Sequence, residues 1–255
     1  MTDIITDADK FSRAVTAAMS RERGLHGSVG TQNEKLIHAA LKAYYAEFSD
    51  EQEIRIGDFF ADAVCEDGIF EIQTRQLYKL KAKLKAFLEY SRVTVVYPSP
   101  AVLGTLYINE DSGEIVKEVK PRRMSSLIKC FDELYSIREF LGNENLRIIL
   151  ARLRVEKRVY FRGELPDMRS RTARKKIRTE RLPLELCEEI ALKCKADYAQ
   201  FLPDELPGEF TKKEFAAAVG ESAESLRLEV LRTVGLIEKI DKRGKRFLYK
   251  RSTRW

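Results

Sequence analysis

The stretch FFADAVCEDGIFEIQT, residues 59–74, decides the fold predicted for this chain. Phe59–Val64 and Ile69–Thr74 are short runs rich in apolar residues, which is typical of β-strands. Between them lies the dipeptide Asp67-Gly68, and Asp-Gly between two apolar runs is a strong signal for a tight hairpin turn. The sequence therefore predicts a β-hairpin here.

This hairpin carries acidic side chains that can converge on one point. Residues of like parity on a strand share a face, so Glu71 and Gln73 point the same way. Asp62 comes to lie across from them when the hairpin closes, and it sits in an apolar run where an unpaired carboxylate would be costly. Two or three converging carboxylates suit Mg²⁺, which takes oxygen ligands. The bland alternative is a pair of surface carboxylates on a solvated sheet face.

Helices and strands are predicted on both sides of the hairpin. Amphipathic patterns indicate helices over Asp9–Arg23, Thr31–Tyr45, Gln76–Tyr90, Asp132–Leu141 and Leu184–Leu202. Further strands are expected at Glu53–Ile56, Val93–Tyr97, Leu103–Ile108, Glu114–Val119 and Leu146–Tyr160, with Pro98 ending the second of these. The mixture predicts the α/β class, with an α+β mixed sheet flanked by helices.

The order of these elements resembles the PD-(D/E)XK, or restriction-endonuclease-like, nuclease superfamily. That family places an Asp in one strand and Glu-x-Lys in the next, followed by a helix. Asp62, then Glu71-Ile72-Gln73, then the Gln76–Tyr90 helix match this order. Many members also have a Glu on the helix before the sheet, where Glu34 stands here. The resemblance covers roughly residues 28–100 and implies a restriction-endonuclease-like fold.

The resemblance also implies a metal site. Asp62 and Glu71 would ligate Mg²⁺ or Mn²⁺ with help from the Ile72 carbonyl, and Glu34 would complete the ligands directly or through water. Glu34 has a second interpretation, since it follows Thr31 by three residues as in a capping box.

The departure from the family pattern is Gln73, where the family usually has a lysine that orients the attacking water and adds positive charge. A glutamine can hold a water but brings no charge. Either Arg75 or Lys79 substitutes for the lysine, or activity is weak or lost.

Two neighbouring residues leave alternatives open. Asp58 is a rival for Asp62, because Gly57-Asp58 also ends a strand. His38, one turn after Glu34, can approach the site, although a lone histidine is more often a packed or surface residue.

The charge distribution favours an anionic partner. The net charge is +6, and the Gln76–Tyr90 helix is rich in lysine, although such a helix can also be only a solvated face. Residues 162–183 turn basic and read as a linker or exposed arm. Candidate phosphate contacts in these two regions are Arg75, Lys79, Lys83, Arg171, Arg174 and Lys175.

The C-terminal pattern is helix, turn, helix and a basic two-stranded hairpin. Thr211 is the expected N-cap of the first helix, and Ser222 that of the second. With GLIEKIDKRGKRFLYK at residues 235–250, the pattern resembles a winged helix-turn-helix domain, whose second helix enters the DNA major groove. The candidate DNA contacts are Arg227, Lys242, Arg243, Lys245 and Arg246. Winged helices also serve in protein interaction or dimerisation.

Together these features predict a nuclease-like domain over residues 1–161, a basic linker over 162–183, and a helical segment plus winged helix over 184–255. The expected function is metal-dependent hydrolysis of DNA, preferably double-stranded, in restriction, repair or defence. The alternatives are a catalytically inactive DNA-binding or regulatory protein and a protein-interaction scaffold. No apolar run approaches the roughly 18 residues of a membrane span and no signal region opens the chain, so a cytoplasmic protein is expected. A homodimer remains open.

Overall fold

The computed structural model describes residues 7–23, 32–46, 52–121, 127, 130–174, 177–220 and 224–252. The elements of the first part are α1 (Ala8–Arg23), α2 (Gln32–Tyr45), β1 (Gln52–Ile56), β2 (Phe59–Cys65), β3 (Gly68–Ile72), η2 (Leu77–Leu80), α3 (Lys81–Phe87), β4 (Val93–Asn109), β5 (Ile115–Val119), α4 (Cys130–Ser136), η4 (Arg138–Phe140) and β6 (Leu146–Phe161). They are followed by α5 (Arg171–Arg174), β7 (Arg178–Leu192), η5 (Lys195–Phe201), β8 (Glu209–Thr211), α6 (Lys212–Val219), α7 (Glu224–Thr233), β9 (Ile237–Arg243) and β10 (Arg246–Arg251).

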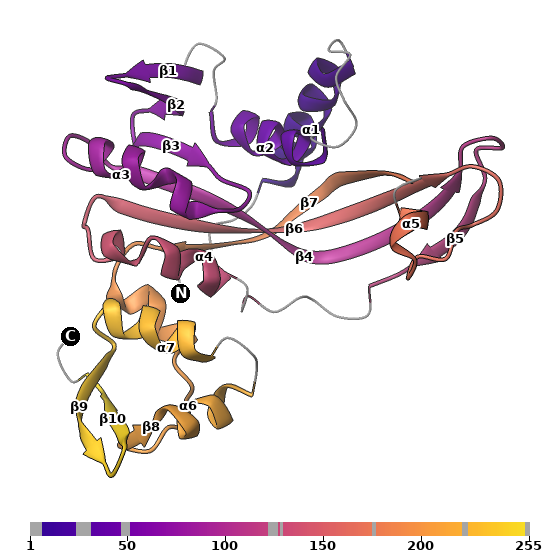
Figure 1. Cartoon of the computed structure of the whole chain (residues 1–255). Helices are drawn as coiled ribbons and strands as arrows, with labels where there is room; N and C mark the ends of the chain where they lie inside the picture. Colours follow the sequence, from indigo (N-terminus) through magenta and orange to yellow (C-terminus); the bar gives the residue numbers. More distant parts are fainter. Residues whose placement is uncertain are drawn as a thin grey trace.

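A large mixed sheet forms the centre of the molecule (Figure 1). Within the described residues it has seven strands in the order β1-β2-β3-β4-β6-β7, with β5 paired to the far part of β4. β3, β4 and β6 run parallel, and the other pairs are antiparallel. The predicted mixed α/β class, a mixed sheet flanked by helices, is therefore confirmed.

Helices cover the two faces of the sheet separately. α1 and α2 pack on one face, where Leu41 and Ile149 belong to one buried cluster. α3, α4 and η5 pack on the other face, around Leu84 and Phe131. Adjacent residues of a strand point to opposite faces, so Val95 and Val96 of β4 fall into different clusters. The predicted helix over Gln76–Tyr90 is present as η2 followed by the shorter α3.

The prediction that Pro98 ends a strand is wrong, because β4 continues to Asn109. The Val96 carbonyl accepts a hydrogen bond from Gln73 N–H at 3.0 Å, so the backbone polar groups of Val96, and of alternate residues after it, face the β3 side. β3 ends at Ile72 and does not extend beside Pro98. The missing N–H of the proline therefore breaks no pairing with a neighbouring strand.

The predicted helix over Leu184–Leu202 is wrong for most of its length. β7 is a strand that pairs antiparallel with β6, from Arg178 opposite Tyr160 to Leu192 opposite Ile148, and only η5 is helical. A register irregularity between Arg152 and Leu153 places Leu186 and Glu189 on the same face of the sheet, whereas Leu192 is buried on the opposite face. The buried positions therefore follow a spacing of three that imitates a helix. The segment 162–183, read as a linker, thus contains α5 and the first residues of β7.

The distal parts of β4, β6 and β7, together with β5 and α5, extend beyond the helices as an arm (Figure 1). Cations and carboxylates pair along it: Arg154 lies 2.9 Å from Glu185, and Arg158 lies 2.7 Å from Glu156. The arm is therefore basic in sequence, but part of its positive charge is compensated internally.

The C-terminal unit consists of β8, α6, α7 and the β9–β10 hairpin. Its three strands form a second sheet in the order β8-β10-β9. The predicted N-cap Thr211 is confirmed, and Thr211 and Glu214 form a capping box. Phe210 and Leu231 belong to the same buried cluster as Phe131 of α4, and α7 contacts α4, so the unit packs on the helices that cover one face of the large sheet. None of the described helices has the length and apolar character needed to cross a membrane.

Candidate carboxylate site

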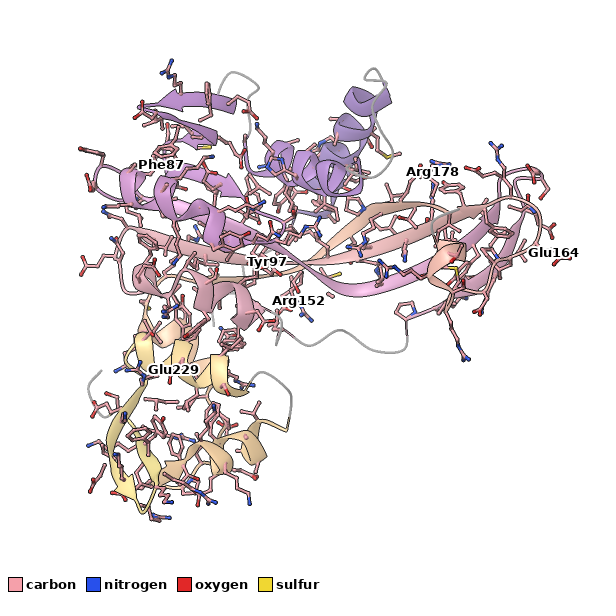
Figure 2. The ribbon with its side chains drawn as sticks, in the orientation of Figure 1. Phe87, Tyr97, Arg152, Glu164, Arg178 and Glu229 are labelled. Carbon is pink, nitrogen blue, oxygen red and sulfur yellow. The ribbon has the colours of Figure 1, made fainter. Side chains whose placement is uncertain are left out.

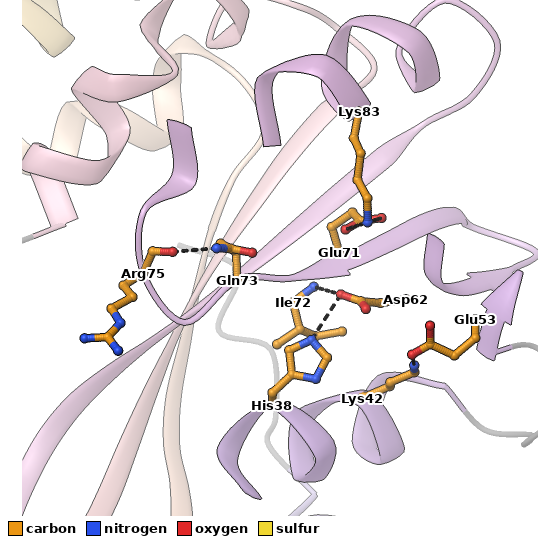
Figure 3. Close-up of polar contacts among 9 residues, drawn as sticks. All are labelled: His38, Lys42, Glu53, Asp62, Glu71, Ile72, Gln73, Arg75 and Lys83. Carbon is orange, nitrogen blue, oxygen red and sulfur yellow. Dashed lines mark hydrogen bonds and ion pairs between the residues drawn. The ribbon is translucent and has the colours of Figure 1, made fainter. Parts of the chain in front are cut away.

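The β2–β3 hairpin brings the predicted acidic residues together (Figure 3). The strands pair from Cys65 opposite Gly68 to Ala63 opposite Phe70. One position further on, the Asp62 carboxylate accepts a hydrogen bond from the backbone N–H of Ile72 at 2.8 Å. The Asp62 side chain thus accepts from a backbone N–H of β3 that the β2–β3 pairing leaves without a partner.

Gly68 anchors the hairpin against β4. Its φ is +114°, and a Cβ atom at this position would lie 2.3 Å from the carbonyl oxygen of Arg92. The next residue, Ile69, donates its N–H to that same oxygen at 2.9 Å. Only glycine fits this conformation and this close approach, so the turn residue predicted from Asp67-Gly68 also fixes the hairpin onto the parallel part of the sheet.

Asp62 is held in its charged form. Its side chain is 16% exposed, and His38 Nε2 of α2 lies 3.3 Å from Asp62 Oδ2. Burial acts to raise the pKa of Asp62, but the contacts with His38 and the Ile72 N–H outweigh it and hold that pKa below its usual range. His38, left open by the sequence, is therefore a direct neighbour of the site.

Glu71 has the opposite tendency. It is 1% exposed, and burial is the main cause that raises its pKa to about 7. The Asp62 charge raises this pKa further, whereas Lys83 lowers it. The Lys83 ammonium lies 3.0 Å from Glu71 Oε1 and 2.8 Å from Oε2. The two carboxylates and this ammonium therefore form one coupled cluster.

Lys83 reaches Glu71 from α3, and the turn before that helix is fixed by a capping carboxylate. Gln76 has φ +61°, and its backbone N–H donates to Glu133 Oε1 at 2.9 Å. The N–H of Leu77 donates to Glu133 Oε2 at 2.7 Å. Glu133 of α4 thus satisfies the first donors of η2, and η2 leads directly into α3.

The cations expected to replace the missing lysine lie elsewhere. Arg75 is exposed, and its side chain points away from Glu71 (Figure 3). Lys79 is exposed on η2. Lys83 had been expected only as a phosphate contact, and it was not recognised as the partner of Glu71. The sequence signal was its place on the lysine-rich helix, which did not distinguish it from its neighbours.

The Gln73 side chain is held by the backbone. Its Nε2 donates to the carbonyl of Arg75 at 2.6 Å, which leaves the amide oxygen on the side of Glu71 (Figure 3). Asp58, the rival for Asp62, lies exposed in the turn between β1 and β2.

Some predicted site residues lie outside the description. Glu34 belongs to α2, but its side chain is outside the described part, as are those of Arg174 and Lys175. Among the described side chains, no group of three His, Cys, Asp or Glu is arranged to hold a metal ion. Asp62 and Glu71 are therefore the two predicted ligands that the structure brings together.

The predicted nucleic-acid contacts are widely separated. Arg171 is exposed on α5 of the arm. Figure 2 labels Glu164 and Arg178 on this arm, far from Phe87 of α3, which lies at the other end of the sheet. Arg227 is predicted to face DNA, and in the structure it donates from Nε and Nη2 to the Phe201 carbonyl at 2.8 and 2.5 Å. The other C-terminal candidates are exposed on the β9–β10 hairpin: Lys242, Arg243, Lys245 and Arg246.

Fold and site define a mixed α/β protein with an aspartate and a glutamate on a β-hairpin and a lysine on the helix that follows. The chain belongs to the family described as "Domain of unknown function (DUF8091)", which matches residues 35–193. The match includes the carboxylate cluster and ends one residue after β7.

A relative with the name "Uncharacterized protein", from Treponema pallidum (strain Nichols), is 30% identical over 229 residues. The similarity covers 88% of this chain and 88% of the relative. A similarity of this length cannot fit within residues 35–193, so it extends beyond the family match. No solved structure matches the chain.

Proposed function

We propose that this protein is a metal-dependent nuclease that hydrolyses phosphodiester bonds in DNA, on a PD-(D/E)XK core. The observation that carries the proposal is the cluster of Asp62, Glu71 and Lys83. The Lys83 ammonium donates a hydrogen bond to the Glu71 carboxylate. The Asp62 carboxylate, on the adjacent strand, accepts from the N–H of Ile72, the residue after Glu71. Phosphodiester hydrolysis needs oxygen ligands for a cation and a positive group near the phosphate.

The donor chemistry fits Mg²⁺ or Mn²⁺. Asp62 and Glu71 supply carboxylate oxygens of the kind that these ions prefer, and the Ile72 carbonyl and Glu34 are the further candidates. Both Glu71 oxygens already accept hydrogen bonds from the ammonium of Lys83, so this site accommodates positive charge. A bound ion would activate a water and neutralise charge that builds up on the phosphate oxygens.

In this proposal Lys83 takes the role of the lysine that PD-(D/E)XK nucleases usually have where this chain has Gln73. Its Nζ lies against Glu71, two residues before Gln73 on the same strand segment. From there it supplies positive charge to the developing negative charge on phosphorus oxygens. Gln73 is held by the Arg75 carbonyl and offers its amide oxygen to a water. His38 keeps Asp62 oriented and charged.

The order η5, β8, α6, α7, β9 and β10 supports the further proposal that the C-terminal unit is a winged-helix module. In a nuclease this module would hold the duplex while the carboxylate cluster acts on it.

The test is cleavage of single- and double-stranded DNA and RNA across a titration of Mg²⁺ and Mn²⁺. Wild-type protein is expected to cut DNA in a metal-dependent way, and Glu71→Ala is expected to be inert. Asp58→Ala is the matched control, since this carboxylate lies in the exposed β1–β2 turn; it should cut like wild type. If wild type and Glu71→Ala are equally inert on every substrate, the nuclease proposal fails.

The second candidate is a DNA-binding or regulatory protein on an inactive nuclease core. The observation that favours it is the same ion pair, because Lys83 neutralises Glu71 without any metal. DNA binding by both wild type and Glu71→Ala, with no cleavage by either, is the result expected from this candidate.

A further inference from the structure

A basic pocket lies between α6 and the β9–β10 hairpin. α6 and the far end of this hairpin lie on the side of the C-terminal unit away from α4 (Figure 1). The volume of the pocket is about 510 Å³. Four cationic side chains line it, two from the start of α6 and two from the β9–β10 hairpin: Lys212, Lys213, Lys245 and Arg246. Phe247 and Tyr249 supply its apolar wall, and no carboxylate belongs to its described lining.

No ion pair within the described part of the chain compensates the positive charge of this pocket. Among the described residues, no carboxylate lies within ion-pair distance of Lys212, Lys213, Lys245 or Arg246. Glu214 is near enough for Arg243 and Arg246 to help lower its pKa, but the hydrogen bonds from Thr211 are the main cause. Those bonds, from Thr211 N–H at 2.6 Å and Oγ1 at 2.8 Å, hold the Glu214 carboxylate at the start of α6.

An exposed aromatic ring extends the pocket along the hairpin. Phe247 is 41% exposed, and Lys239 Nζ lies 3.2 Å from the centroid of its ring. Lys242 Nζ lies 5.1 Å from the same centroid. A ring beside two ammonium groups is a surface that suits a polyanion with apolar parts, such as a nucleic acid backbone with its sugars.

α7, the helix expected to read DNA bases, is committed to contacts within the molecule. Arg227 is bonded to the Phe201 carbonyl, and its guanidinium lies 5.7 Å from the centroid of the Phe131 ring on α4. Arg232, its second arginine, pairs with Glu229 at 2.8 Å. Figure 1 shows α7 between α4 and the rest of the unit. A duplex could not place this helix in its major groove without separating the unit from the large sheet.

We infer that the basic pocket between α6 and the β9–β10 hairpin binds the phosphate backbone of double-stranded DNA without reading its sequence, and that α7 does not enter the groove. This inference shares the DNA partner of the proposed function but does not depend on cleavage. Phosphate contacts carry no sequence information, so affinity should depend on salt and not on the base sequence.

The test is fluorescence anisotropy of the full chain with two labelled 20-base-pair duplexes of unrelated sequence, in EDTA so that no cleavage occurs. Wild type should bind both within about twofold of each other. Lys245→Ala with Arg246→Ala should weaken binding about tenfold or more at low salt and reduce the slope of log K against log salt by about 2, since each phosphate contact contributes about 0.9. Lys212→Ala with Lys213→Ala should have the same effect from the other wall of the pocket.

The matched control is Lys117→Ala with Lys120→Ala, which removes the same charge from exposed positions on and beside β5 of the arm; it should leave the slope unchanged. Arg232→Ala should change neither affinity nor the ratio between the two duplexes. The inference is overturned if both pocket variants bind like wild type, if Arg232→Ala alters the ratio, or if wild type binds no duplex. Retained, salt-dependent binding without any metal-dependent cutting would instead count only against the nuclease proposal.

Discussion

Lys83 Nζ lies within 3.0 Å of both carboxylate oxygens of Glu71, although Lys83 is on α3 and Glu71 is on β3. Glu71 is 1% exposed, whereas the Lys83 side chain keeps partial access to solvent. A carboxylate in such a place is costly unless it is paired or protonated. The pair therefore explains both how a charge is tolerated in the sheet and where positive charge is available beside Asp62.

Replacing Lys83 by methionine should remove this charge and keep most of the side-chain volume. If Lys83 acts in cleavage, the rate should fall by about 100-fold, the usual effect of losing one group that stabilises transition-state charge. Lys83→Arg should retain a measurable part of the rate. Lys85→Met, an exposed lysine on the same helix, is the control and should cut like wild type. A Lys83→Met protein that is folded by circular dichroism and cuts at the wild-type rate would contradict the assignment.

Glu71 should make the stability of the protein depend on pH in a specific direction. Its pKa is raised from the usual 4.5 to about 7, chiefly by burial. Between these values the folded state keeps a proton that the unfolded chain releases, so the free energy of unfolding falls as pH rises, by roughly 3 kcal/mol in total from this group. Urea unfolding in EDTA, at intervals from pH 4 to 8, measures this dependence.

Glu71→Gln is the matched variant for this measurement, because the amide has the same shape and does not titrate. The difference in unfolding free energy between wild type and Glu71→Gln should move against wild type as pH rises from 4.5 to 7. A difference that stays constant across this window would show that the two states of the chain bind the Glu71 proton equally.

Gly68→Ala should destabilise the hairpin far more than an alanine at another glycine of positive φ. At Gly68 the new Cβ would meet the Arg92 carbonyl at 2.3 Å, so the cost combines backbone strain with a clash against backbone, roughly 3 kcal/mol. Gly113 has φ +74° but no atom within 4 Å of a new Cβ, so Gly113→Ala should cost about 1 kcal/mol. Urea denaturation compares the two, and equal costs would refute the close contact with Arg92.

Glu133→Gln should loosen the turn that leads into α3. The two N–H groups of Gln76 and Leu77 bind different oxygens of Glu133, and glutamine replaces one of these by an NH2 that cannot accept. One N–H therefore loses its partner, at a cost of about 1–2 kcal/mol. Glu139→Gln removes a carboxylate of the exposed pair with Lys81 and should cost less than about 1 kcal/mol. Thermal unfolding separates them, and hydrogen exchange at Leu77 should rise only in Glu133→Gln.

Local patterns predicted much of the fold. The apolar runs around Asp67-Gly68 gave the hairpin, and the apolar stripe of Leu36–Tyr44 gave a helix that packs on the sheet. Thr211 with Glu214 predicted the start of α6. Each of these signals depends only on residues a few positions apart in the sequence. The local geometry of the chain is therefore enough to predict the structure from them.

The errors came where pairing between distant strands decides the outcome. Pro98 would end a strand only if the position of its missing N–H faced a paired neighbouring strand, and that depends on where β3 ends. The spacing of three in β7 arises because an irregularity in its register with β6 puts Leu186 and Glu189 on one face, while Leu192 is buried on the other. Tertiary packing also decides the contacts of Arg227, because its side chain bonds to the Phe201 carbonyl of η5 and lies near the Phe131 ring of α4.

The sequence by itself determined the β2–β3 hairpin with Asp62 and Glu71 on it, because alternation along a strand and an Asp-Gly turn are local properties. Only the tertiary structure selected Lys83 from a helix with several lysines, since the direction of α3 is set by the Glu133 cap and by packing on the sheet. It also decided that α7 packs against α4, while the basic pocket lies between α6 and the β9–β10 hairpin. Burial changes the pKa of Glu71, and packing decides whether the Arg227 side chain is accessible to a partner. Both depend on contacts between residues far apart in the sequence, which no short stretch of sequence contains.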